Sequence, residues 1–270
     1  MNKLLRSLNA VLRDPMLFAR LVGALPYGSD SAKFATLYRS DDTCVARKVV
    51  EHNSNPLWQY FTEYQEGPGI WKWQHYFDIY HRHFAQFVNR KVDVLEVGVY
   101  SGGSLDMWHK YFGPQSHIYG VDIVEACKKY ESNHVSIFIG DQADRTFWAR
   151  FSQVVKGIDI LIDDGGHSPE QQQVTLEEML PRLRPGGIYM CEDIHHRFNG
   201  FTEFAVGLVR ELNAFSQRAD QQKGTELTSF QSAIHSIHFY PFVMVVEKHL
   251  LPATNLASLK RGTEWSPAAL

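Results

Sequence analysis

Three acidic residues follow short apolar runs in the middle of the chain, and one of them leads into a glycine-rich turn. Glu96 precedes the turn Gly98–Ser104, Asp122 ends the next run, and Asp141 follows the third. Such a turn lets the backbone approach a ligand at the carboxyl edge of an α/β sheet, where these folds bind nucleotides. Asp122 is placed to accept both hydroxyls of a ribose, and Asp141 to meet an adenine edge. Each acid alone is more often a solvated strand end, but the three together indicate a nucleoside site.

The glycines of this turn, Gly98, Gly102 and Gly103, have the spacing GxxxGG and not GxGxxG. The second glycine of the dinucleotide pattern, which lets a pyrophosphate approach, is missing. The spacing therefore disfavours a dinucleotide and leaves a nucleoside without phosphates as the predicted ligand.

A second acidic set follows the next two apolar runs and consists of Asp163, Asp164, Glu192 and Asp193. The carboxyl ends of neighbouring strands in a doubly wound sheet open on one crevice, so these side chains are predicted to be neighbours. Crowded carboxylates repel one another and take up protons unless a cation joins them. Oxygen ligands favour Mg2+, Mn2+ or Ca2+ over zinc. The competing interpretations are a helix cap for one acid and a surface ion pair for another.

His167 lies immediately before a predicted helix. Ser168, Pro169 and Gln171 are typical of an N-cap, a proline at the first helical position and a capping-box glutamine. The positive end of that helix, with a nearby cation, favours a neutral imidazole, which can take a proton. His167 is therefore predicted to be a general base; the alternative is a histidine that holds the turn by hydrogen bonding.

Seven short β-branched runs supply the strands that must position these groups. Five of them alternate with helix-compatible stretches, which predicts a doubly wound parallel sheet. The last two are joined by Tyr240-Pro241 and predict a closing β-hairpin whose last strand runs antiparallel to the others. The predicted fold class is α/β, with strands at residues 92–97, 118–123, 135–139, 158–162, 188–191, 234–239 and 242–247.

The chain divides near residue 90. We expect a helical, aromatic-rich N-terminal extension over residues 1–90, a nucleoside-binding domain over 91–250 and a C-terminal tail over 251–270. Turn-like sequences at 27–30, 53–56 and 66–69 interrupt the extension. One predicted helix face, which would dock on the sheet, carries Trp73, Phe77, Tyr80, Phe84 and Phe87. The polar tips of three neighbours off that face could border a ligand site: His75, Tyr76 and His83.

Composition excludes several classes of protein. The 270 residues are 44% hydrophobic with a net charge of -3, which excludes a disordered chain and gives no electrostatic reason to expect nucleic acid or an anionic membrane as a partner. Cys44, Cys127 and Cys191 form no close pair, so the reducing cytoplasm is the expected location. No run approaches the roughly 18 apolar residues of a membrane span. The amphipathic pattern at residues 4–12 predicts a packing helix or oligomer arm, with a membrane-surface or targeting segment as the alternative.

Five sequence motifs together resemble a known family: LEVGVYSGGSLDMW, IYGVDI, IGDQ, IDDGGH and GGIYMCEDIH. They are similar to the metal-dependent branch of the class I S-adenosyl-L-methionine-dependent methyltransferases, which is related to macrolide-sugar and rhamnosyl O-methyltransferases and includes proteins named cephalosporin hydroxylase. The resemblance implies a Rossmann-like sheet whose S-adenosyl-L-methionine site contains Glu96, Gly98, Ser101, Ser104, Asp122, Ile123, Asp141, Gln142 and Asp164. It also implies that Mg2+ (or Mn2+) is held by Asp164, Glu192 and Asp193, with His167 as the catalytic base.

The activity implied by this resemblance is methyl transfer to a hydroxyl of a small molecule, with a sugar of a glycosylated natural product or a glycan as the expected acceptor. A catechol-type O-methyltransferase would use the same metal. A metal-dependent oxygenase is a further alternative, since histidine and carboxylates can build an iron site, and a non-catalytic binding module is another. The N-terminal 90 residues and the segment 198–230 are expected to carry acceptor specificity, with Phe198, Phe201 and Phe204 in a lid or a packing helix. A homo-oligomer is expected.

Overall fold

The computed structural model describes residues 9, 11–37, 55–214, 225–259, 261 and 262. The chain forms two compact units, residues 1–51 and 52–270, each of which is described by itself. Cys44 and the leucines predicted to lie on one helix face at residues 4–8 fall outside the described residues. Cys127 and Cys191 are buried free thiols. Among the described residues, no helix is both long and apolar enough to cross a bilayer.

The first unit contains the helix α2 (Pro15–Ala35). The turn predicted at residues 27–30 is wrong, because these residues continue α2, with Pro26 inside it. A glycine within a helix costs only about 1 kcal/mol relative to alanine, so Gly28 weakens the helix without ending it. In the same turn, the Ser31 hydroxyl donates a hydrogen bond to the Gly28 carbonyl oxygen at 2.8 Å.

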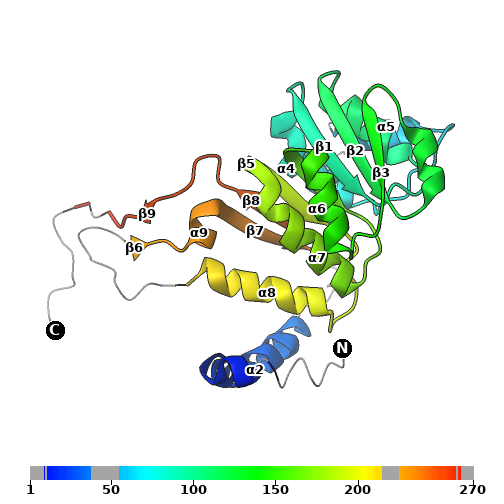
Figure 1. The fold of residues 1–270 in the computed structure, drawn as a ribbon. Coiled ribbons are helices and arrows are strands. Elements are labelled where there is room, and N and C mark those ends of the chain that lie inside the picture. The colour runs from blue at the N-terminus through cyan, green and yellow to red at the C-terminus, as the bar shows by residue number, and fades with distance from the viewer. Residues whose placement is uncertain (1–8, 10, 38–54, 215–224, 260, 263–270) are drawn as a thin grey trace, which may run out of the picture. The chain divides into compact units, whose positions relative to one another are not determined.

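The second unit is built on a seven-stranded sheet with the strand order β3-β2-β1-β4-β5-β8-β7 (Figure 1). The five strands β1 to β5 are parallel, whereas β8 pairs antiparallel with both β5 and β7. The predicted doubly wound sheet with an antiparallel closing hairpin is therefore confirmed. The strands are β1 (Val92–Val97), β2 (Ser116–Asp122), β3 (Val135–Ile139), β4 (Ile158–Asp163), β5 (Leu183–Cys191), β7 (Ile234–Tyr240) and β8 (Val243–Lys248), and a separate short pair consists of β6 (Thr225–Glu226) and β9 (Asn255–Leu256).

Helices cover both faces of this sheet because its strands are apolar on both sides. Along β4, Ile160 and Ile162 belong to one core cluster and Leu161 to the other. The first cluster contains α3, α4 and α5, and the second contains α6, α7 and α8, of which Figure 1 shows α6 and α7 lying over the sheet. The helices are α3 (Pro56–Glu63), α4 (Tyr76–Phe84), α5 (Gly103–Phe112), α6 (Arg145–Val154), α7 (Pro169–Met179), α8 (Gly200–Leu212) and α9 (Ser229–Ala233), with 3-10 turns η2 (Ala85–Phe87), η3 (Glu125–Tyr130) and η4 (Leu180–Arg182).

The aromatic face predicted for residues 73–87 is only partly a helix face. Phe77, Tyr80 and Phe84 lie on α4 and are fully buried, as predicted. Because α4 begins at Tyr76, Trp73 precedes it and is not in the core; its side chain is 49% exposed. Among the aromatic residues of the segment 198–230, Phe201 is buried in the second core cluster and Phe204 packs against it, whereas Phe198 is 90% exposed.

The register of the sheet explains why distant acids meet. Val97 of β1 is level with Val121 of β2 on one side and with Asp163 of β4 on the other. Asp163 is in turn level with Cys191 of β5. The residues one step further along these strands are Asp122, Gly98, Asp164 and Glu192, so they emerge side by side at the carboxyl edge.

Candidate active site

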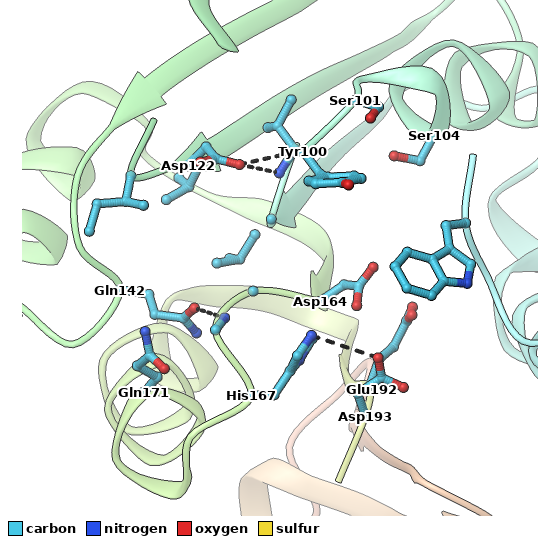
Figure 2. A pocket seen from close by; sticks show the side chains of 18 of the residues that line it. Tyr100, Ser101, Ser104, Asp122, Gln142, Asp164, His167, Gln171, Glu192 and Asp193 are labelled. Carbon is cyan, nitrogen blue, oxygen red and sulfur yellow. Dashed lines mark hydrogen bonds and ion pairs between the residues drawn. The ribbon is translucent and has the colours of Figure 1, made fainter. Parts of the chain in front are cut away.

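A cavity of about 690 Å³ opens at the carboxyl edge of the parallel strands (Figure 2). Its walls are the loops that follow β1 to β5 and the segment 69–76, which leads into α4. The site residues predicted from the sequence that line the cavity are Gly98, Ser101, Ser104, Asp122, Ile123, Asp141, Gln142, Asp164, His167, Glu192 and Asp193. Acids from both predicted sets therefore face one space: Asp122 and Asp141 from the first, and Asp164, Glu192 and Asp193 from the second.

Glu96 is not among the lining residues. It is fully buried, where its carboxylate accepts hydrogen bonds from the Ser104 hydroxyl at 2.7 Å and from the Trp108 indole at 3.1 Å. Burial raises the pKa of this carboxyl group. Glu96 thus ties β1 to the first turn of α5, and its position supports the glycine turn from behind.

Asp122 is held by backbone groups. One carboxylate oxygen accepts from the amides of Val99 and Tyr100, both at 2.9 Å, and the other accepts from Val124 at 2.8 Å. Gly98 has φ +92°, and a Cβ there would overlap the carbonyl oxygen of Asp164. Only glycine therefore allows the turn after β1 to press against the turn after β4.

The turns after β3 and β4 are joined by Gln142. Its amide nitrogen donates to Asp163 at 2.9 Å, and its amide oxygen accepts from the backbone of Gly166 at 2.7 Å. Burial raises the pKa of Asp163 to about 7, and Tyr189 donates to its second oxygen, so this acid serves the fold from below the cavity. Asp141 stays exposed and caps its own turn by accepting from the Ala143 amide.

Asp193 is held by side chains that come from far upstream. Its Oδ1 accepts from the Trp73 indole at 3.0 Å and from the Tyr76 hydroxyl at 2.8 Å, and the His195 Nε2 lies 3.4 Å away. Burial and this contact raise the pKa of Tyr76, which keeps the phenol protonated and able to donate. Oδ2 faces the Nε2 of His167 at 3.7 Å (Figure 2). Tyr76, which could border a ligand site, lines the cavity, whereas His83 is directed elsewhere, to Glu247 and Tyr240.

His167 lies immediately before the N-cap of α7, as the capping motif predicts. The predicted capping box is confirmed, with Ser168 and Gln171 bonded reciprocally at the start of α7. His167 itself has φ +55°, in the left-handed region that is unusual for a side-chain-bearing residue. Its Nδ1 is buried and has no hydrogen-bond partner among the described residues, so no protein contact there fixes the tautomer.

Lys72 is the functional residue that sequence reasoning missed. Its side chain is 3% exposed, and its ammonium lies 2.6 Å from Asp164 Oδ2, 3.1 Å from Glu192 Oε2 and 3.6 Å from Glu96 Oε1. Burial alone would lower the pKa of Lys72, but the three carboxylates raise it well above its ordinary value. No motif points to this lysine, because it lies in an irregular segment about ninety positions before Asp164 in the sequence.

Two carboxylates and an imidazole of the cavity are close enough to hold one cation, and Glu192 is not in this group. Asp164, His167 and Asp193 each offer an atom, and these atoms lie within 4.8 Å of one another. Glu192 is joined to Asp164 through the Lys72 ammonium, while Tyr80 donates to its other oxygen at 2.7 Å. Burial raises the pKa of Glu192, and Lys72 opposes that shift. The Lys72 ammonium places one positive charge between the carboxylates of Asp164 and Glu192.

Comparison with known proteins relates the chain to a protein family. A family model described as a methyltransferase domain matches residues 95–194. This part of the chain is a methyltransferase domain. The matched residues include the glycine turn, both predicted acidic sets and His167. They supply most of the cavity lining, and the segment 69–76 and His195 supply the rest.

Named relatives agree with this family. The chain is 31% identical over 201 residues to the 8-demethyl-8-alpha-L-rhamnosyl tetracenomycin-C 2'-O-methyltransferase of Streptomyces olivaceus. The aligned residues cover 68% of this chain and 53% of that protein. The chain is 36% identical over 188 residues to the demethylmacrocin O-methyltransferase of Streptomyces fradiae, 63% of this chain and 47% of that protein. The chain thus spans about half the length of the curated relatives it matches.

A solved structure shows the same fold. The MycE methyltransferase from the mycinamycin biosynthetic pathway, in complex with Mg and SAH, matches with a TM-score of 0.58 and 28% identity over 66% of this chain and 50% of that chain. The Rossmann-like methyltransferase sheet expected from the sequence motifs is therefore confirmed.

Proposed function

We propose that the chain is an S-adenosyl-L-methionine-dependent O-methyltransferase that uses a divalent cation, Mg2+ or Mn2+, and acts on a hydroxyl of a glycosylated small molecule. The observation that supports this most strongly is that acids from both predicted sets line one cavity of the methyltransferase domain: Asp122, Asp141, Asp164, Glu192 and Asp193. The sugar acceptor rests on the relatives, two of which are named for methylation of rhamnosyl tetracenomycin and of demethylmacrocin. Natural-product biosynthesis in the cytoplasm stays a prediction.

The donor half of the cavity is assigned to the turns after β1, β2 and β3. A ribose hydroxyl of the donor would bond to Asp122, which lines the cavity: Oδ1 accepts one backbone bond and keeps a lone pair free, whereas Oδ2 already accepts two. Gly98, Ser101, Ser104, Ile123, Asp141 and Gln142 would complete this half. Glu96 would act from behind the turn, through Ser104, and without touching the donor.

The acceptor half is assigned to the turns after β4 and β5. Asp164, Glu192 and Asp193 would hold the divalent cation, which supplies positive charge that lowers the pKa of a bound hydroxyl and fixes its position. His167 would accept the hydroxyl proton at Nε2 while the oxygen forms a bond to the methyl carbon and the carbon–sulfur bond of the sulfonium breaks. Trp73 and Tyr76 orient Asp193, and Trp73 also borders the cavity.

The base assignment is tested by His167→Ala. We expect S-adenosyl-L-methionine to bind to this variant within about twofold of the wild-type affinity, while turnover falls by about 10²–10⁴-fold, the usual contribution of a general base. Calorimetry measures the first quantity and release of S-adenosylhomocysteine the second. Full turnover of the variant would remove His167 from the reaction.

Acceptor class is tested with the wild-type protein. Release of S-adenosylhomocysteine is compared between rhamnosides or macrolide glycosides and catechols in the presence of Mg2+. Turnover of catechols alone would keep the methyltransferase and overturn the sugar acceptor.

A further inference from the structure

The segment before α4 places three consecutive side chains in different surroundings. Trp71 is 85% exposed at the rim of the cavity, and Trp73 bonds to Asp193. Lys72, between them, is directed inward and is almost fully buried. The side chain of Lys72 therefore places its ammonium beside the carboxylates of Asp164 and Glu192.

The Lys72 ammonium contacts two carboxylates and lies near one aromatic ring. The 2.6 Å contact to Asp164 Oδ2 is short, as expected for a charge-assisted hydrogen bond. Glu192 accepts a second bond at 3.1 Å, and the ring of Tyr80 lies with its centroid 5.9 Å from the ammonium. A lysine of this kind is costly to bury without partners, so its carboxylates and the lysine stabilise one another.

We propose that Lys72 is a built-in cation that occupies part of the divalent-ion position in the metal-free protein and leaves Asp164 when the ion binds. This inference rests on the proposed function, because Asp164 and Glu192 are two of the three carboxylates assigned to the metal. The two cations compete, since each draws on the same oxygens and they repel each other. Lys72 thereby bridges Asp164 and Glu192 until an ion arrives, and its charge sets how tightly that ion is held.

If Lys72 and the divalent ion compete, removal of the Lys72 charge should increase the affinity for the ion. Lys72→Met keeps much of the aliphatic chain and removes the charge, which leaves buried carboxylates without their cation. The metal-free variant is then less stable, and a divalent ion restores what the ammonium supplied. We expect Mn2+ to bind about tenfold more tightly to the variant than to the wild type, a change of about 1.4 kcal/mol.

The probe is Mn2+ alone, with free ion measured by electron paramagnetic resonance and no donor or acceptor present. Lys156→Met is the matched control, because Lys156 is exposed and its loss makes the same change in net charge. This control should bind Mn2+ within about twofold of the wild type, as expected for a screened surface charge. A second readout is thermal unfolding: Mn2+ should raise the Tm of Lys72→Met by more than that of the wild type.

Unchanged or weaker Mn2+ binding by Lys72→Met would overturn the proposal. If this variant unfolds without metal, Lys72→Gln is the second neutral variant, and recovery of either fold by Mn2+ supports the proposal. Failure of both variants to fold even with Mn2+ counts against it, because the ion then does not replace the ammonium. A wild type that binds neither Mn2+ nor S-adenosyl-L-methionine would instead refute the proposed function.

Discussion

Asp122 and Asp193 stand at opposite ends of the same cavity and are held in different ways (Figure 2). Asp122 accepts three backbone amide bonds from residues of its own and the neighbouring turn. Asp193 accepts side-chain bonds from Trp73 and Tyr76, more than a hundred positions upstream. The end that we propose for the methyl donor is thus fixed by local strand–turn geometry, and the end that we propose for the acceptor by packing of the segment 69–76 onto the methyltransferase domain.

The two aspartates therefore depend on different features of the molecule: Asp122 on backbone groups and Asp193 on particular side chains. The bonds that Asp122 accepts come from the backbone amides of residues 99, 100 and 124, so they do not depend on the side chains at those positions. Side-chain bonds require particular residues, so substitutions in the segment 69–76 alter the acceptor end while the sheet remains intact. Substrate specificity can therefore change without change of the donor site.

The largest effect is expected at the acceptor end, with Asp193→Asn. The amide removes a proposed metal ligand charge and places an NH2 group opposite either His167 or the donors Trp73 and Tyr76. Turnover should fall by about 10²–10³-fold, which corresponds to several kcal/mol of lost metal-assisted stabilisation. Affinity for S-adenosyl-L-methionine, measured by calorimetry, should change little. Tyr76→Phe removes one donor only and serves as the matched control with a smaller loss.

Asp122→Asn should give the reverse pattern. Loss of charged hydrogen bonds to the ribose, each worth about 1.5–3 kcal/mol, should weaken S-adenosyl-L-methionine binding by about 10–100-fold. Mn2+ affinity and turnover at saturating donor should stay near the wild-type values. If Asp122→Asn instead abolished Mn2+ binding, the two ends would not be separate.

Glu247→Gln addresses a carboxylate outside the cavity and should have the smallest effect on activity. The hydrogen bond from His83 lowers the pKa of Glu247 to about 2, from an ordinary value of 4.5. The ionised carboxylate therefore stabilises the fold above pH 4.5, and this stabilisation is lost as the pH falls toward 2. Between these values the Tm of the wild type should fall more steeply than that of the variant. Parallel Tm curves would show that the His83 contact contributes nothing to acid stability.

The sequence was sufficient for the sheet because its signals are local. The runs at 92–97 and 135–139 match β1 and β3 residue for residue, and the register of the sheet then brings Asp122 and Asp164 to one edge. The place of β8 between β5 and β7 depends on the partner each strand finds, which no local pattern encodes.

The acceptor end could be predicted only in part for the same reason. Asp164, Glu192 and Asp193 follow strands, so their place in one cavity could be predicted, whereas Lys72 belongs to no element and carries no motif. Trp73 was assigned to a core face because its spacing fits a helix, yet the helix begins three residues later. Glu96 was placed against the donor, although its partners Ser104 and Trp108 hold it beneath the turn.

The central claim is that this cavity transfers a methyl group to a sugar hydroxyl with the help of a divalent cation. Release of S-adenosylhomocysteine from S-adenosyl-L-methionine and a rhamnosylated or macrolide glycoside, with Mg2+ and with a chelator, tests it most directly. The account predicts release in Mg2+, loss in chelator and recovery when Mg2+ is returned. Equal release in chelator would contradict the metal assignment, and binding of S-adenosyl-L-methionine without turnover of any hydroxyl acceptor would contradict the claim itself.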